Sequence, residues 1–416
     1  MHKAIPFILV LLVMAGCVAP QAGPTPTPSP PARPPSRSTP VPTLAPTVAA
    51  PSPTASATSS PPTPTAAPTA APPQGGVLPA PLYVLDNGQI ARIERDGKSR
   101  SLVTNERVDI QGLAPVATFA LARAGDIAYV VGDLKADRLV RAGPHGEGRR
   151  TIYEAEGHEL SDLVWSSDGA QIYLRMLNNR QPPDTPSGIY RVSAEGGALE
   201  LLRADDPVDN VANPSPTISG YRPFSTSPDG SHILMEITST YYNNCSLGVM
   251  PVGGGNAVRL DLPPGIKTFC GEATWSPDGT AVYFLAGPEA GPTVWRGDTA
   301  SGATMAMATI DVLSRAPLAL PGGVLRFFLV RRDPSGAGAM SFVMANLTAP
   351  QAAPAPLGVP FSDRLGRVLW APDGSGAAMG VETASKSVDL RWATADGPPV
   401  PLPNTNQGIA DMAWGR

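Results

Sequence analysis

The chain of 416 residues carries 31 Lys and Arg against 35 Asp and Glu, which gives a formal net charge of −4. A weak negative charge that is spread thinly argues against nucleic acid as a partner. Only 16% of the residues are charged, whereas 42 are glycine and 50 are proline, a composition typical of a turn-rich β protein with a proline-rich segment.

The first residues predict a bacterial lipoprotein signal. Met1-His2-Lys3 is a short positive segment, and the apolar run that follows to Met14 is too short to span a membrane. The small residues before Cys17 resemble a lipobox, with Met14 where Leu is more usual. We therefore expect residues 1–16 to be removed and Cys17 to be lipidated, which anchors the chain to the extracytoplasmic side of the cell membrane. The alternative is plain secretion with an incidental cysteine.

Residues 17–76 predict a disordered linker after the lipidated cysteine. From Val18 to Gly76 the chain has 19 prolines in 59 residues, no aromatic residue and no acid. So little apolar surface cannot offset the entropy of ordering the backbone. The proline content favours an extended stalk that holds the following domain away from the membrane, and its Thr and Ser residues suit O-glycosylation.

A five-residue unit then recurs through residues 77–416. Trp275-Ser276-Pro277-Asp278-Gly279 has near-copies that end at Gly169, Gly230 and Gly374, and a short apolar run follows each copy. Pro presets φ, Asp suits the turn and Gly supplies a positive φ, so each unit predicts a strand, a tight turn and a strand. We expect the repeated Asp residues to cap their turns and the Trp residues to pack in the core.

The spacing of the units predicts a β-propeller. With two weaker copies, the position held by Trp recurs at 121, 165, 226, 275, 319, 370 and 414, which gives spacings of 44, 61, 49, 44, 51 and 44. A period in the forties with several strands per unit is typical of one four-stranded blade. The expected fold is all-β with seven blades, or six if one weak copy is false. The last strand, Ile409 to Trp414, should close the ring by completing the first blade, which begins at Leu82.

These Trp-Ser-Pro-Asp-Gly units resemble the WD-like repeats of TolB-type β-propellers over roughly residues 82 to 416. The resemblance implies the propeller fold. In TolB-type proteins, the resemblance implies a six-bladed propeller that follows a small α/β domain. This sequence instead has seven repeat positions and shows no such domain. The partner of TolB, a peptidoglycan-associated lipoprotein, is therefore not carried over to this chain.

Three long connections are expected on the face opposite the Pro-Asp-Gly turns: 177–187, 204–220 and 239–246. Long connections in a compact domain are often functional. Their aromatic, amide and acidic side chains suit a glycan or a peptide, although ordinary polar loops would have the same composition. The candidate binding residues are Arg180, Asp184, Asp206, Asp209, Tyr241, Tyr242, Asn243 and Asn244.

The other two cysteines, Cys245 and Cys270, are expected near the same face, the first at the start of a third strand and the second in the next crossover. Outside the cytoplasm they should form a disulfide that pins the loop containing Tyr241. No His lies nearby and no metal-ligand spacing is present, which argues against zinc. The prediction is of no metal and no cofactor, with Ca²⁺ held by the acids of the long connections as the alternative.

The search for catalytic motifs gives none. No Ser lies in a Gly-x-Ser-x-Gly turn, and no His-Glu-x-x-His or phosphate-binding loop occurs. We expect a non-catalytic, membrane-anchored propeller that binds a protein, peptide or glycan of the cell envelope. The alternative is a hydrolase or lyase with a channel-centred, metal-dependent site.

Overall fold

The computed structural model describes residues 76–107, 115–132, 136–178, 185–208, 217–239, 242–288, 291–309, 312–332, 340–362, 364–382, 387–403 and 409–415. The chain divides into two units, Met1–Thr69 and Ala70–Arg416, and every described residue belongs to the second. The predicted signal segment, Cys17 and almost all of the predicted linker lie outside the described residues. None of the described residues forms a helix long and apolar enough to cross a membrane.

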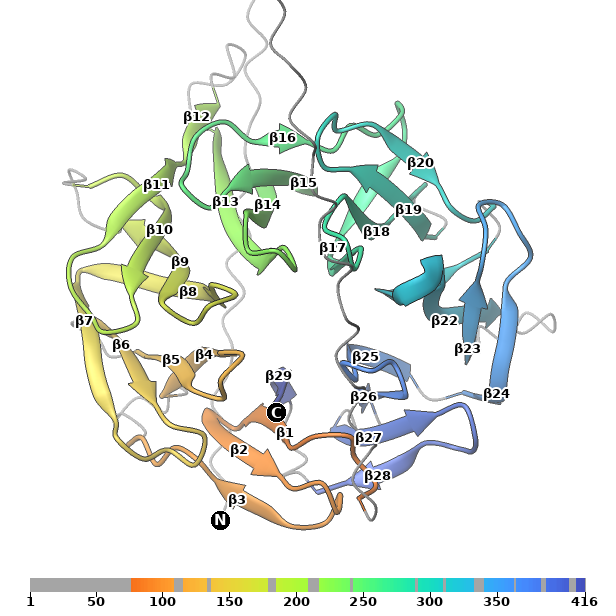
Figure 1. The fold of residues 1–416 in the computed structure, drawn as a ribbon, viewed down its shortest axis with the longest axis horizontal. Helices are drawn as coiled ribbons and strands as arrows, with labels where there is room; N and C mark the ends of the chain where they lie inside the picture. The colour runs from red at the N-terminus through yellow and green to blue at the C-terminus, as the bar shows by residue number, and fades with distance from the viewer. Residues whose placement is uncertain are drawn as a thin grey trace, which may run out of the picture. The chain divides into compact units, whose positions relative to one another are not determined.

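The described chain folds into antiparallel strands with a single 3-10 turn, Pro321–Gly323. Five sheets have four strands each, in the orders β29-β1-β2-β3, β4-β5-β6-β7, β8-β9-β10-β11, β21-β22-β23-β24 and β25-β26-β27-β28 (Figure 1). The strands of the first three of these are β1 (Leu82–Asp86), β2 (Gln89–Ile93), β3 (Arg100–Leu102), β29 (Ile409–Trp414), β4 (Val116–Leu121), β5 (Ile127–Val131), β6 (Ala136–Ala142), β7 (Arg150–Glu156), β8 (His158–Trp165), β9 (Gln171–Asn178), β10 (Gly188–Ser193) and β11 (Glu200–Ala204). Those of the last two are β21 (Ser314–Ala319), β22 (Leu325–Arg332), β23 (Met340–Leu347), β24 (Ala355–Phe361), β25 (Arg364–Trp370), β26 (Gly376–Glu382), β27 (Val388–Thr394) and β28 (Val400–Leu402).

The sixth sheet is larger because two groups of strands are joined. It has nine strands in the order β12-β13-β14-β15-β17-β18-β19-β20, with β16 paired to β15. One backbone pairing, Cys245 with Thr268, connects β15 to β17. The strands are β12 (Asp206–Val208), β13 (Thr217–Thr226), β14 (His232–Ser239), β15 (Tyr242–Pro251), β16 (Val258–Arg259), β17 (Lys267–Trp275), β18 (Ala281–Gly287), β19 (Thr293–Asp298) and β20 (Thr304–Ala306).

The repeated turns form as their sequence predicts. In the turn after β13, Gly230 has φ +74° and its N–H donates to the Ser227 carbonyl at 2.9 Å. The Asp229 carboxylate accepts hydrogen bonds from the Ser227 hydroxyl at 2.6 Å and from the Ser231 N–H at 3.1 Å. The turn is therefore closed by its own residues, and the repeated Asp caps it.

Every repeat position ends an innermost strand, the strand nearest the common axis of the sheets (Figure 1). The seven strands in question are β4, β8, β13, β17, β21, β25 and β29, and their last residues are Leu121, Trp165, Thr226, Trp275, Ala319, Trp370 and Trp414. Trp165, Trp275 and Trp370 are buried. The indole N–H of Trp165 donates to the Ala120 carbonyl of β4 at 3.1 Å, so the side chain ties its sheet to the preceding one.

The core consists of apolar clusters between successive groups of strands. One cluster joins Leu139 of the second sheet to Leu174 of the third, and another joins Leu234 to Val282 within the nine-stranded sheet. Among the described residues there are seven such clusters, one at each junction between successive groups. Burial between wedge-shaped sheets explains why the second strand of each unit is apolar on both faces.

The two ends of the ordered chain pair with one another, as predicted. β29 is antiparallel to β1, with Trp414 opposite Leu82 and Met412 opposite Val84. The described residues form seven innermost strands and seven apolar clusters. The same residues form six continuous hydrogen-bonded sheets. The choice between seven blades and six therefore stays a prediction.

Candidate functional site

The long connections predicted as a binding face meet along one edge of neighbouring strands. The backbone register places Asp206 opposite Ser219, Ser219 opposite Ser239, and Ser239 opposite Tyr242. On the other side of this row, the N–H of Asp205 donates to the carbonyl of Ser187 at 2.8 Å. We call this row the loop edge, and its described residues are 185–188, 204–208, 217–220, 239 and 242–246.

Asp206 is the one candidate binding residue whose side-chain contacts the structure describes. Its Oδ2 accepts hydrogen bonds from the hydroxyl of Tyr221 and from Nη2 of Arg203, the latter at 2.7 Å. The Arg203 guanidinium also lies 4.8 Å from the centre of the Tyr221 ring, a cation–π contact. About half of the Asp206 side chain (53%) is exposed, so this carboxylate stands at the surface in a fixed orientation.

The other candidates are not described to the same degree. For three of them only the backbone is described, in the first residues of β15: Tyr242, Asn243 and Asn244. The remaining four lie outside the described residues: Arg180, Asp184, Asp209 and Tyr241.

Two of the predicted connections are shorter than expected. The segment 239–246 was expected to be a loop, but β14 ends at Ser239 and β15 begins at Tyr242. Within 204–220, β12 adds a short strand and β13 begins at Thr217. Tyr and Thr residues suit extended backbone, and pairing with the neighbouring strands extends both segments. Cys245 accordingly lies inside β15, and Cys270 lies inside β17 rather than in a crossover.

A buried ion pair that the sequence did not predict lies next to the loop edge. Arg175 of β9 and Asp205 are both buried, with Nη2 and Oδ2 at 2.9 Å. Burial raises the pKa of the Asp205 carboxyl, and the Tyr221 N–H and Arg175 oppose that rise. The Arg175 guanidinium also donates to the Tyr221 carbonyl at 2.6 Å, and a Cβ at Gly220 would lie 2.7 Å from that guanidinium. A side chain at position 220 would therefore require the Arg175 guanidinium to shift.

The predicted disulfide is present between Cys245 and Cys270, whose Cα atoms are 6.0 Å apart. It bridges β15 and β17 next to the one backbone pairing that joins these strands. The following residue, Gly271, has φ +80°, and its N–H donates to the buried Glu236 carboxylate at 2.5 Å. The bridge therefore fixes the joined sheet near the loop edge.

A second group of charged residues lies on the innermost strands, where each strand shifts its register against the second strand of its unit. Three ion pairs connect neighbouring innermost strands: Asp162–Arg222 at 2.7 Å, Glu272–Arg315 at 2.5 Å and Asp411–Arg367 at 2.6 Å. Burial raises the pKa of the Asp411 carboxyl, and Arg367 opposes the rise. The sequence carried no signal for these pairs because bulges decide which residue each strand turns toward the axis.

Each histidine of the described chain contacts a different residue. His158 begins β8 and lies 3.0 Å from the Thr185 hydroxyl, His145 contacts Arg92, and His232 contacts Ser231. In the part of the chain that the structure describes, no group of three or more His, Cys, Asp or Glu side chains could hold a metal ion. On the innermost strands, Asp162, Glu272 and Asp411 are each paired with an arginine.

No protein-family model matches the chain, and no curated protein matches it. Solved structures do match. They include TolB from Acinetobacter baumannii, at 16% identity over 82% of this chain and 67% of that chain with a TM-score of 0.47. They also include puromycin hydrolase (15% identity, 78% of this chain, 53% of that chain, TM-score 0.54) and prolyl oligopeptidase B from Galerina marginata (10% identity, 81% of this chain, 52% of that chain, TM-score 0.54).

The chain spans about half of the length of these last two structures. At such identities the matches show the fold alone, and that fold is the β-propeller that the repeats predicted. TolB, the family that the repeats resemble, is among the matching structures.

Proposed function

We propose that this protein is a binding module of the cell envelope, anchored by a lipid on Cys17 and displaying the loop edge to a protein, peptide or glycan. The proposal assigns no catalysis to the propeller. The lipobox-like sequence before Cys17 supports the lipid anchor, and the proline-rich segment 17–76 is the proposed stalk. The Cys245–Cys270 disulfide supports a location in an oxidising compartment.

The observation that carries the proposal is the alignment of the long connections along one edge. Backbone pairing holds 204–208, 217–220, 239 and 242–246 in adjacent rows, and the Arg175–Asp205 pair and the disulfide lie next to them. The backbone-paired part of this surface loses little conformational entropy when a partner binds. The aromatic and polar side chains of this edge suit a peptide or a glycan.

The ion pairs of the innermost strands favour binding over catalysis. A general acid or base must exchange its proton during turnover, and Asp162, Glu272 and Asp411 are each held by an arginine of the neighbouring strand. The raised pKa of Asp411 is a feature in favour of the enzyme alternative.

Site-specific photo-crosslinking in intact cells tests the proposal. A photoreactive residue replaces Pro186, which is exposed in the connection between β9 and β10, and, in a matched variant, Ala170, which is exposed in the turn at the other end of β9. Both positions belong to the same sheet, so they differ only in the face they occupy. We expect a defined adduct from position 186 and none from position 170. Equal labelling at both positions, or none at 186, contradicts the assignment of the loop edge.

The tether has its own test. Cys17→Ala removes the lipid acceptor and should release the folded protein from the membrane fraction, whereas Cys270→Ala should leave it membrane-bound. Retention of the Cys17→Ala protein in the membrane fraction would show that another element anchors the chain.

A further inference from the structure

A cavity of about 340 Å³ lies on the opposite face from the loop edge, where the turns of the second sheet end. Its lining residues are Asp126, Arg141, Ala142, Gly143, Glu147, Gly148 and Arg150. Asp126 immediately precedes β5, Arg141 is the last residue but one of β6, and Arg150 begins β7, so these charged side chains come from three neighbouring strands or their ends. The volume is within the range of small-molecule sites.

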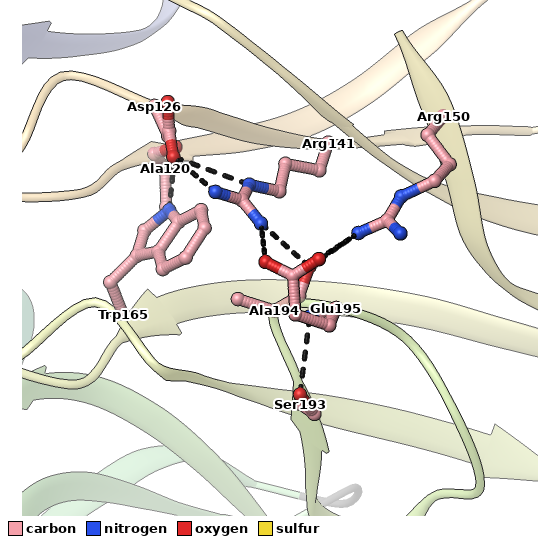
Figure 2. A network of polar contacts seen from close by, with 8 residues as sticks. All are labelled: Ala120, Asp126, Arg141, Arg150, Trp165, Ser193, Ala194 and Glu195. Atoms are coloured by element: carbon pink, nitrogen blue, oxygen red, sulfur yellow. Dashed lines mark hydrogen bonds and ion pairs between the residues drawn. The ribbon is translucent and has the colours of Figure 1, made fainter. Parts of the chain in front are cut away.

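Two arginines of this cavity converge on a single carboxylate from the next sheet (Figure 2). Glu195, in the turn between β10 and β11, places Oε1 against Nη1 of Arg141 and Oε2 at 2.7 Å from Nη2 of Arg150. Asp126 holds the other side of the Arg141 guanidinium, with Oδ2 at 2.6 Å from Nη2 and 3.2 Å from Nε. The two guanidiniums are therefore oriented to bind both oxygens of one carboxylate.

Glu195 is suited to leave this position. Its side chain is 71% exposed, and ion pairs at such exposed positions contribute little to stability. Its turn is anchored independently of the carboxylate, because the Gly196 N–H donates to the Ser193 carbonyl at 2.8 Å and the Glu195 N–H donates to the Ser193 hydroxyl at 3.1 Å. When the Glu195 side chain rotates into solvent, the turn keeps these two hydrogen bonds. Arg141 keeps its contact with Asp126, and both arginines keep the Ala194 carbonyl, at 3.3 Å for Arg141 and 3.4 Å for Arg150.

We propose that Arg141 and Arg150 form a binding site for the carboxylate of a small hydroxylated acid, and that Glu195 is an intramolecular ligand that this acid displaces. The exchange is one carboxylate for another on the same two guanidiniums, so no covalent bond changes and the charge is balanced. The site lies on the face away from the loop edge, so the inference is independent of the proposed partner binding.

The other residues that line the cavity limit which chemical groups the ligand can carry besides its carboxylate. Two carboxylates also line the cavity: that of Asp126, which is bound to Arg141, and that of Glu147, which accepts a hydrogen bond from the His145 N–H at 2.8 Å. A Cβ added at Gly148 would have no heavy atom within 4 Å, so there is open space beside them. Carboxylates accept hydrogen bonds and repel a second negative charge. A ligand with several hydroxyl groups can donate to these carboxylates, and a ligand with only one carboxylate avoids the repulsion. Both properties point to a sugar acid rather than a dicarboxylate.

Isothermal titration of the full chain with D-glucuronate, at low ionic strength, tests the site. D-glucose is the matched probe because it has a hydroxymethyl group in place of the carboxylate. Glu195→Ala, which removes the resident carboxylate, should bind glucuronate about threefold to fivefold more tightly than the unsubstituted protein, the gain expected when a weak, exposed competitor is removed from two charge-assisted contacts. Arg150→Gln in the Glu195→Ala background should lose this gain, and glucose should bind to none of the proteins.

The control is Glu200→Ala. Glu200 and Arg191 form an ion pair of 2.6 Å in the same sheet as Glu195, with a similarly exposed carboxylate, but Arg191 does not line the cavity. This variant should bind glucuronate no better than the unsubstituted protein. Equal affinity in Glu195→Ala and Glu200→Ala, no binding by Glu195→Ala, or equal binding of glucose and glucuronate overturns the proposal. The melting temperature of each variant confirms that it is folded.

Discussion

At the scale of single residues, the repeated turn owes its conformation to a serine and an aspartate. The hydroxyls of Ser166, Ser227 and Ser276 each donate to the Asp two positions later at 2.6 Å. Because hydrogen bonds favour the charged form, the pKa values of Asp168, Asp229 and Asp278 lie below their ordinary value, with the serine hydroxyl as the largest cause. These aspartates therefore stabilise turns.

The lowered pKa of Asp229 predicts a loss of stability in acid. Since the folded pKa lies below the unfolded one, this contribution is complete above about pH 4 and is lost as the pH falls through the folded pKa. The melting temperature, measured between about pH 5 and about pH 2, should fall less steeply in Asp229→Asn and in Ser227→Ala than in the unsubstituted protein. An unchanged slope in both variants contradicts the role given to this turn.

The indole N–H of Trp165 gives a second prediction at this scale. Trp165→Phe removes the partly buried hydrogen bond from the indole N–H to the Ala120 carbonyl, so the free energy of unfolding should fall by about 1 kcal/mol from this cause. Trp295→Phe is the control, because Trp295 is also buried but its Nε1 has no hydrogen-bond partner. Urea denaturation measures both, and an equal loss in the two variants would mean that volume, rather than the hydrogen bond, explains the effect.

At the scale of elements, the junction between β15 and β17 is unusual. A single backbone pairing, one disulfide and the Glu236–Gly271 hydrogen bond connect two groups of strands into one sheet of nine. The disulfide closes a segment of 25 residues. It therefore restricts the unfolded chain and also holds β15, which starts at the loop edge, against its neighbour.

Replacing both cysteines by serine should lower the free energy of unfolding by about 3 kcal/mol, the value of the chain-entropy model for a loop of this size. Hydrogen exchange should become faster in β15 and β17 (Tyr242–Pro251 and Lys267–Trp275) and should stay unchanged in β5 (Ile127–Val131), which lies in another sheet. Uniform acceleration across the molecule would show that the bridge acts only through global stability.

At the scale of the whole propeller unit, Ala70–Arg416, closure depends on the last strand. β29 supplies the innermost strand of the first sheet, and Met412 belongs to the cluster that also contains Val84 and Leu390. Without it, β1 would present an unpaired edge on which another chain could pair.

Truncation after residue 408 should therefore lower the melting temperature sharply and lead to aggregation, observed by light scattering during heating. Removal of residues 18–69, which belong to the separate first unit, should leave the melting temperature unchanged. A truncated chain that stays monomeric and melts at the original temperature would show that closure by β29 is dispensable.

The architecture could be predicted closely, and the candidate site only in part. Turn stereochemistry is local, so the repeat located the end of every innermost strand from Leu121 to Trp414. The face of the long connections was predicted from topology, but their lengths were overestimated because pairing with neighbours extended β12, β13 and β15. Eight binding residues were proposed there, and only Asp206 has a described side chain in a defined set of contacts.

By itself the sequence determined the all-β repeat, the pairing of the chain ends and the partnership of Cys245 with Cys270, because each depends on a short motif or on a residue type that is rare in this chain. Tertiary structure alone decided which charges meet. Arg222 pairs with Asp162 from 60 residues away, and Glu195 reaches Arg141 across 54 residues. No local pattern encodes such pairs, since they depend on how each sheet packs and on where a bulge turns a side chain.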